Sequence, residues 1–345
     1  EKELHQREHW LMPLVDQQIH YPDIISCLEV AACLGGEFGR SEWVEICARV
    51  GLRMPEGVVE TLIDRGFLSF DQYGRGRFVH SQCQESIASL MASMSRGMEY
   101  HRCIAEVLAQ SRDPDPWRLS EHYRRAEYFE FACVHLETSF LLAMSQERYV
   151  RVRDVLMAWS VCLKGRGKGL RSDDWLALKL KWATYQERVG RPVCSRRHAV
   201  VVCQRLGNRP GSSLKIESLL LWTLASKWEI GASEANLERI RKAQQMAVEL
   251  GDPRLTAKCA ERHAVYLHTY GHLKASLLQF EFALNCSDAS LDASFAALVN
   301  RGIARLCLDM NRVEAAHTYA QRALSLVKHQ ANGSFAASIM TTLGD

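Results

Sequence analysis

The side chains that could bind a metal ion include a group of histidines in the segment HAVYLHTYGH, which holds His263, His268 and His272. Two helix residues that share a metal ion must lie on one face of the helix. The step from His263 to His268 does not place both rings on one face. We therefore expect these histidines to pack or to face solvent, and we predict no metal site in the chain.

The twelve cysteines occur singly from Cys27 to Cys307, and none forms a Cys-x-x-Cys pair. Such paired spacing is the usual signature of a zinc or redox site. Most of the cysteines instead fall on apolar helix faces. We predict buried thiols that act as small hydrophobic side chains in a reducing compartment.

The loop KGRGKGLRS at 164–172 has glycines and lysines that could suit phosphate, but it lacks the Gly-x-x-x-x-Gly-Lys-Ser/Thr spacing and no strand precedes it. We predict a basic, flexible connector. No Ser/His/Asp or Cys/His arrangement and no close pair of carboxylates can be argued from the sequence. We therefore predict that the chain has no catalytic residue and is not itself an enzyme.

The composition is that of ordinary globular protein, with 345 residues, 47% of them hydrophobic and 24% charged. The 43 basic and 40 acidic residues give a net charge of +3, which offers no strong electrostatic reason to expect a nucleic acid or a membrane as partner. No uninterrupted apolar run approaches the ~20 residues of a membrane span. We expect a cytoplasmic location and no membrane partner.

Helices must position these side chains, and a regular interval predicts how they are arranged. Gly190, Gly231, Gly271 and Asn311 follow one another at gaps of 41, 40 and 40 residues (231−190, 271−231, 311−271). A fixed period of this size, with two helical patterns in each unit, is typical of a solenoid. Glycine or asparagine at the break suits a left-handed helix end.

Small residues flank these breaks. They are Ala264 before Gly271 with Ser276 and Ala283 after it, and Ala304 and Cys307 before Asn311 with Ala316, Ala320 and Ala323 after it. Small residues let two helices approach closely, and Phe280 fills the space beside them. The last two-thirds of the chain thus resemble the tetratricopeptide family, with a unit about six residues longer than the usual ~34. We predict a right-handed solenoid of helical hairpins over 99–345, truncated at Leu343 and Gly344 in the middle of a repeat.

The N-terminal quarter has a different pattern. An apolar helix is predicted at 23–34, a second from a Ser41 cap to Val50, and a third after Pro55 with Val58, Val59, Leu62 and Ile63 on one face. FLSF and RFVH then flank the polar turn DQYGRG, where Gly74 and Gly76 would supply the turn geometry. Three helices followed by two strands predict a small winged-helix domain with a two-stranded wing at 23–98. The fold class is therefore all-α, with this one small β element.

A winged helix often binds DNA through its third helix. Here that helix carries Glu56, Glu60 and Asp64 against the single Arg65 at its end, and carboxylates repel phosphates. The wing adds only Arg75 and Arg77. We expect no nucleic-acid contact.

The order LEVAACLGGEF, VVETLIDRGFLSF, GRFVHSQCQESIASLM, HRCIAEVLAQ and LSEHYRRAEYFEFACVHL resembles the segment after the ATPase core in bacterial signal-transduction ATPases with numerous domains. The resemblance covers nearly the whole chain. It implies an AAA-type nucleotide-binding domain, then a winged helix and a tetratricopeptide sensor array, with relatives linked to kinase, cyclase or LuxR-type domains. Because the chain starts at Glu1 without methionine, we expect a piece of a longer protein. Residues 1–22 would be a linker or helix from a preceding domain.

The same resemblance gives His80 a role. In related ATPases a histidine at the start of the helix after the wing can contact the bound nucleoside diphosphate, and His80 in FVHSQ occupies the matching place. The aspartate that follows in the better-known version is replaced by Ser81, which could form a capping box with Gln84. His80 could equally be a half-buried residue at the end of a strand. ATP or ADP is implied for the neighbouring domain only.

Three functions remain open at this point. The first is a regulatory segment whose repeats bind a protein or small-molecule signal and whose winged helix relays it to the ATPase. The second is a transcription regulator whose winged helix contacts DNA, which would show as salt-dependent duplex binding. The third is a passive tetratricopeptide scaffold, which should not change its oligomeric state or nucleotide turnover with a ligand.

Overall fold

The computed structural model describes residues 22–207, 212–231, 233–286 and 293–327. These residues form sixteen helices and one small three-stranded sheet, which confirms the predicted helical fold class. They divide into two compact units. The first unit runs from the first described residue to Ser139 and includes Val161–Gly167, and the second comprises Phe140–Ser160 and the described residues from Lys168 onward.

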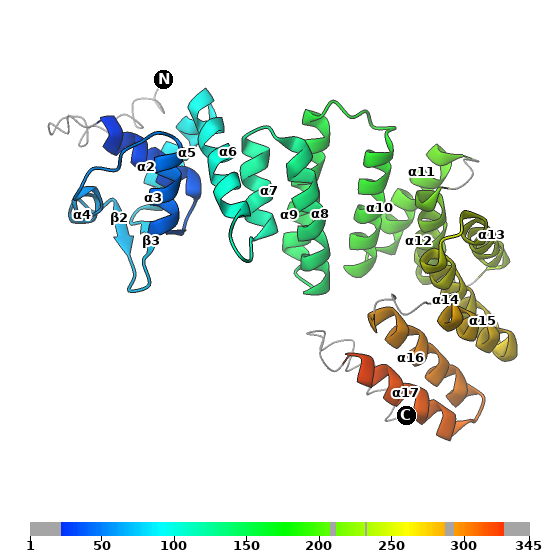
Figure 1. The fold of residues 1–345 in the computed structure, drawn as a ribbon. Coiled ribbons are helices and arrows are strands. Elements are labelled where there is room, and N and C mark those ends of the chain that lie inside the picture. The colour runs from blue at the N-terminus through cyan, green and yellow to red at the C-terminus, as the bar shows by residue number, and fades with distance from the viewer. Residues whose placement is uncertain (1–21, 208–211, 232, 287–292, 328–345) are drawn as a thin grey trace. The chain divides into compact units, whose positions relative to one another are not determined.

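The first unit holds helices and all three strands of the small sheet (Figure 1). Its elements are α2 (Pro22–Leu34), β1 (Phe38–Gly39), α3 (Arg40–Arg49), α4 (Val58–Asp64), β2 (Leu68–Phe70), β3 (Arg75–Phe78), α5 (Ser81–Ala92), α6 (Ser95–Ala109) and α7 (Pro116–Arg125). The predicted order of three helices followed by a β-hairpin is confirmed. The strand β1 was not predicted, because two residues are too short to show an alternating pattern.

The sheet has the antiparallel order β1-β3-β2, so β3 pairs with both other strands. Gly76 lies within β3 opposite both Phe38 and Phe70, and a Cβ atom there would be 2.5 Å from the Phe70 ring. The prediction that Gly76 shapes the turn was therefore wrong. Asp71 closes the turn by accepting hydrogen bonds from the backbone amides of Tyr73 and Arg75, both at 2.9 Å.

Two predicted helix caps were wrong. Gly39, not Ser41, is the N-cap of α3, and its amide donates to Glu42 Oε2 at 3.2 Å. His80 is the N-cap of α5, so Ser81 lies inside the helix and the predicted capping box does not form. A long-range contact uses the Gln84 side chain instead, since its Nε2 donates to the Ala32 carbonyl at 3.2 Å.

The core of the first unit lies between α2, α3 and the sheet. Trp43 is fully buried, and its indole Nε1 donates to the Cys27 carbonyl at 2.8 Å, which satisfies its only polar atom. The Phe38 ring meets Trp43 edge-on, with the ring centroids 5.6 Å apart. On α4, Val58, Val59 and Leu62 are buried as predicted, whereas Ile63 is 41% exposed.

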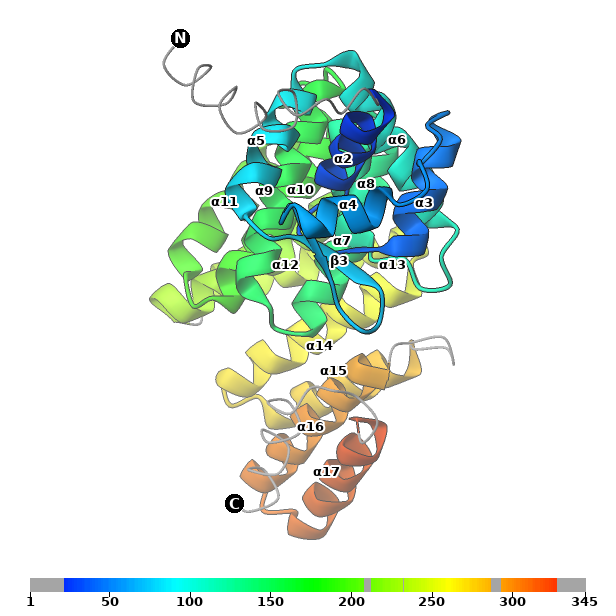
Figure 2. The same cartoon turned by 90° about the vertical axis from the view of Figure 1, so that its left-hand side faces the viewer.

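The second unit consists of helical hairpins, and Figures 1 and 2 show α16 and α17 side by side as one such pair. The pairs that contact each other are α10 (Asp173–Arg188) with α11 (Pro192–Leu206), α12 (Ser213–Ile230) with α13 (Glu234–Leu250), α14 (Pro253–Thr269) with α15 (Leu273–Asn285), and α16 (Ala293–Asp309) with α17 (Val313–Val327). Gly190, Gly231, Gly271 and Asn311 lie between the helices of these pairs, with φ of 73°, 78°, 77° and 56°. The positive φ predicted at each break is confirmed, but Gly231 combines it with a ψ of −175°, which is not the left-handed helical conformation. Leu343 and Gly344 lie outside the described residues.

Close helix approach is achieved by alanines at one equivalent position of each first helix. Ala183, Ala225, Ala264 and Ala304 are all fully buried. Gly302 extends this packing, because a Cβ atom there would lie 2.7 Å from the Phe280 ring. The prediction of buried cysteines is confirmed for nine of the twelve side chains.

The regular turns also continue upstream of Gly190. Glu127 precedes α8 (Phe129–Ser145), Glu147 precedes α9 (Tyr149–Gly165), and Gly167 follows α9, at two steps of 20 residues (147−127, 167−147). Their φ values are 61°, 56° and 64°. Residues 166–172 join α9 to α10 as predicted, whereas Lys164 and Gly165 of the predicted connector are the last residues of α9. No helix in the described part of the chain has both the length and the apolar character that a membrane span needs.

Candidate functional site

His80, the nucleotide-contact residue implied by the family resemblance, is exposed at the start of α5. Its backbone is extended, with φ −116° and ψ 113°, and its side chain makes no capping hydrogen bond. Its carbonyl accepts from the amides of Cys83 at 3.1 Å and Gln84 at 3.4 Å. The backbone of His80 therefore begins the helix, while the exposed ring is accessible from solvent.

The three histidines of 263–272 do not converge. His263 Nδ1 lies 2.8 Å from Gln244 Oε1, and His268 Nε2 contacts the carboxylate of Asp309. His272 is the N-cap of α15. Among the described residues, no group of three or more His, Cys, Asp or Glu side chains is arranged to hold a metal ion.

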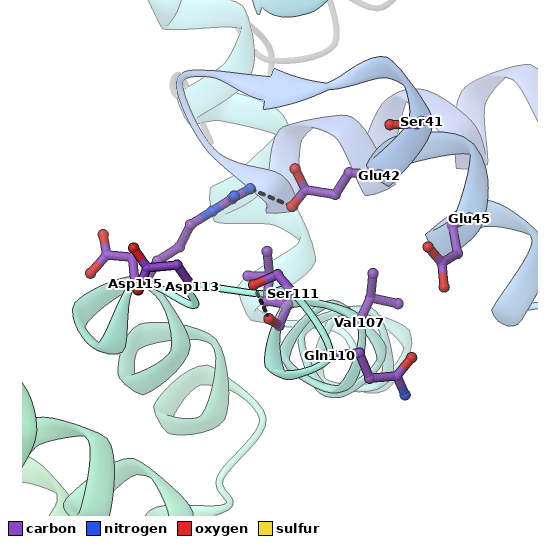
Figure 3. A pocket seen from close by; sticks show the side chains of 10 residues that line it. Ser41, Glu42, Glu45, Val107, Gln110, Ser111, Asp113 and Asp115 are labelled. Carbon is purple, nitrogen blue, oxygen red and sulfur yellow. Dashed lines mark hydrogen bonds and ion pairs between the residues drawn. The ribbon is translucent and has the colours of Figure 1, made fainter.

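A pocket of about 560 Å³ lies on the first unit between α3 and the segment that joins α6 to α7 (Figure 3). Its polar groups already have structural roles. Arg118 forms an ion pair with Glu42 at 2.8 Å, which ties α7 to α3. Asp115 caps α7 by accepting from the Trp117 amide at 2.9 Å. The pocket is thus best explained by the packing of these helices.

A second group of polar side chains lies in the second unit. It occupies helix positions that would carry apolar side chains if the repeat served packing alone. We call it the cationic cluster, and it consists of Trp222, Lys227, Asn236, Arg239, Glu261, Arg262, Tyr266 and Arg301. Most of its members come from α12, α14 and α16, the first helices of three successive hairpins. These helices contact one another in sequence, α12 with α14 and α14 with α16.

The repeat itself brings the cluster together. Trp222, Glu261 and Arg301 each lie three residues before a fully buried alanine of the packing position, at 225, 264 and 304 (225−222, 264−261, 304−301). Equivalent positions of stacked hairpins lie on the same face of the array. The cluster therefore collects residues about one repeat apart in the sequence.

Aromatic rings hold two of the cations. The Arg239 guanidinium lies over the Trp222 ring at 4.3 Å from its centroid, and its Nη1 donates to Asn236 Oδ1 at 2.7 Å. The Lys227 ammonium lies 5.9 Å from the centroid of the Tyr266 ring. The Tyr266 hydroxyl donates to the Thr223 carbonyl, which fixes that ring. Cation–π contacts of this kind contribute about 0.5–2 kcal/mol each, depending on their exposure.

Burial makes the cluster electrostatically strained. Glu261 has a side chain only 8% exposed and lies 3.8 Å from the Arg262 guanidinium. Burial lowers the pKa of Lys227, the neighbouring Arg262 lowers it further, and Glu261 opposes both. Burial also lowers the pKa of Arg301, again opposed by Glu261. The carboxylate of Glu261 therefore acts on all three of these cations.

One further polar group in the cluster is buried without a complete set of partners. Asn236 is 1% exposed, and its Nδ2 has no hydrogen-bond acceptor among the described residues. A buried donor in this condition costs about 1–3 kcal/mol. The side chains of the cationic cluster therefore offer hydrogen-bond donors to a ligand, but few acceptors.

Several solved structures are similar to this chain at low sequence identity. NprR, a quorum sensor from B. thuringiensis in its apo form, is 14% identical with a TM-score of 0.50, and the match covers 88% of this chain and 78% of NprR. A signal-transduction ATPase with numerous domains and a tetratricopeptide repeat sensor, from Pyrococcus horikoshii, is 13% identical with a TM-score of 0.44 over 94% of this chain. The chain spans 54% of that protein's length. The apo form of RapI is 10% identical with a TM-score of 0.39, covering 70% of this chain and 94% of RapI.

No protein-family model matches the sequence, and neither does a curated protein. The likeness to NprR shows a shared fold of tetratricopeptide-like helical repeats.

The cationic cluster was not predicted from the sequence. The available signal was the position three residues before each packing alanine, which holds tryptophan, glutamate and arginine in successive repeats. These types alone are ordinary on helix surfaces. Only the stacking of the hairpins shows that they share one half-buried face.

Proposed function

We propose that this chain is a non-catalytic sensor segment whose helical repeats bind a protein or small-molecule signal. The observation that carries the proposal is the cationic cluster, where Lys227 and Arg262 are both neighbours of the buried carboxylate of Glu261. Removing charges from water without balanced partners costs stability. We expect such a loss of folding stability to be retained where a ligand binds to the charged groups.

The first unit would relay the signal to a nucleotide-binding domain in the longer protein. We propose that 23–98 is a winged-helix domain and that 99–345 is the repeat array, with 1–22 joining them to a preceding domain. The order of helices and strands supports the winged helix, and the accessible ring of His80 supports a contact with ADP or ATP bound to that neighbour. Any ATPase, kinase or cyclase activity would then belong to another domain.

The surface of the first unit favours this relay over DNA binding. Glu56, Glu60 and Asp64 are all exposed on or beside α4. Arg75, in the wing, is already paired with Asp71 at 2.8 Å. A phosphate backbone approaching α4 would therefore meet carboxylates first.

The proposal is tested by a thermal-shift screen of the whole chain against small molecules and peptides of every charge type. A compound that raises the unfolding temperature should bind Arg239→Gln more weakly, because Arg239 belongs to the cluster. Arg241→Gln is the matched control, since Arg241 is exposed on the same helix and pairs with Glu234 and Glu238. If every stabilising compound binds both variants equally, or none stabilises the chain, the repeats are better explained as a scaffold.

A further inference from the structure

The charges that face Lys227 are unbalanced. Its charged neighbours are Arg262 on α14, which disfavours its charged form, and Glu261 on the same helix, which favours it. Among the described residues its ammonium contacts the face of the Tyr266 ring but no hydrogen-bond acceptor. An ammonium carries three N–H donors. These donors are therefore available to a ligand.

Glu261 makes no close ion pair with its neighbour Arg262. It lies 3.8 Å from Arg262, which is longer than a good charge-assisted hydrogen bond of about 2.7–2.9 Å. It also acts on Lys227 and on Arg301. Its carboxylate thus acts on several cations at once, and another anion could share or take over that role.

We propose that the signal bound by the repeats carries an oxyanion, a carboxylate or a phosphate, which binds between Lys227 of α12 and Arg262 of α14. This inference rests on the proposed binding function of the repeats. Glu261 acts as a built-in competitor that neutralises the cations in the absence of ligand. Arg239, held on Trp222, acts on the same Tyr266 side chain as Arg262 and so adds a further cation to the site.

Two sources of the oxyanion can be separated with simple probes. Citrate offers carboxylates and inorganic phosphate offers a compact dianion. Sodium chloride at matched ionic strength controls for general screening. Isothermal titration of the whole chain with each probe gives its dissociation constant, and the tighter probe identifies the source.

Charge-removing variants locate the binding. Lys227→Gln should weaken the tighter probe by about tenfold or more, because it removes a charged donor from a half-buried site. Lys242→Gln removes an exposed lysine from α13 and should leave the affinity unchanged. Glu261→Gln should tighten binding several-fold because the competitor is gone. Circular dichroism checks that each variant is folded, and Arg262→Gln replaces Lys227→Gln if the latter unfolds.

The inference is overturned if folded wild-type chain binds neither probe, or if the Lys227 and Lys242 variants bind equally. Its failure is distinct from that of the proposed function. If a neutral or cationic compound binds the chain and binds Arg239→Gln more weakly, the sensor proposal stands and only the oxyanion proposal fails. If no compound of any charge type binds the repeats, both proposals fail.

Discussion

The Nδ1 atoms of His101 and His122 lie 3.0 Å apart, which joins α6 to α7 through two buried imidazole rings. The residues are 2% and 5% exposed. One ring must donate its Nδ1 proton and the other must accept it, so at least the accepting ring must be neutral and the contact is lost when both rings are protonated. Burial is the main reason that the pKa of His101 falls to about 3 and that of His122 falls well below its usual value, and nearby arginines add to it.

This pair predicts that the first unit loses stability in mild acid. Between the unfolded pKa of about 6.5 and the lowered folded value, the unfolded chain binds more protons than the folded chain. Stability is therefore full above about pH 6.5 and falls by roughly 1.4 kcal/mol per pH unit for His101 as the pH drops below it. Hydrogen exchange of the α6 and α7 amides at about pH 7 and about pH 5.5 measures this slope.

The control for this prediction is a histidine elsewhere. His122→Gln should flatten the slope, whereas His317→Gln on the exposed face of α17 should not. Equal slopes in the two variants would show that other groups cause the acid sensitivity.

The contact between Gly302 and Phe280 predicts a sensitive packing position. Gly302→Ala places a methyl group 2.7 Å from the ring, which should destabilise the second unit by about 1–3 kcal/mol in chemical denaturation. Phe280→Leu makes room, so the double variant should be more stable than the sum of the two single effects. Strict additivity would mean that the ring moves aside without cost.

Glu127 predicts a stabilising substitution. It adopts a φ of 61° at the end of α7, and that conformation is strained for every residue with a Cβ except to some extent asparagine. Glu127→Gly should stabilise the first unit by about 0.5–1 kcal/mol, whereas Glu127→Ala should not. A loss of stability in the glycine variant would show that the side chain contributes more than the backbone strain costs.

Because the ring of His80 is exposed, we expect its removal to affect nucleotide binding but not the stability of the chain. His80→Ala should leave the unfolding of this chain unchanged, because the side chain makes no capping bond. In a longer protein that includes the nucleotide-binding domain, the same variant should release bound ADP faster. Unchanged nucleotide retention would remove the proposed role of His80.

The sequence predicted the helical hairpins because glycine or asparagine marks each turn of positive φ from Gly190 to Asn311. It did not predict the same turns at Glu127 and Glu147, because glutamate carries no local signal for a positive φ. Gly76 was misassigned for the opposite reason. Its role is to admit the Phe38 and Phe70 rings, which come from two other strands.

The candidate site depends on contacts at a longer range than any sequence pattern spans. Glu261 and Arg301 are 40 residues apart (301−261), and only the contact of α14 with α16 brings their charges together. By contrast, the prediction that His263 and His268 do not share a helix face depends only on helix geometry over a few residues, and in the structure the two rings contact different partners, Gln244 and Asp309.

The most direct test of the central claim is hydrogen exchange across the whole chain, with the tighter of citrate and phosphate and separately with a short DNA duplex. The claim predicts slower exchange in α12, α14 and α16 with the anion and no protection of α4 or β3 by DNA. Protection of α4 and β3 by the duplex, with no change in the repeats under either condition, would contradict it.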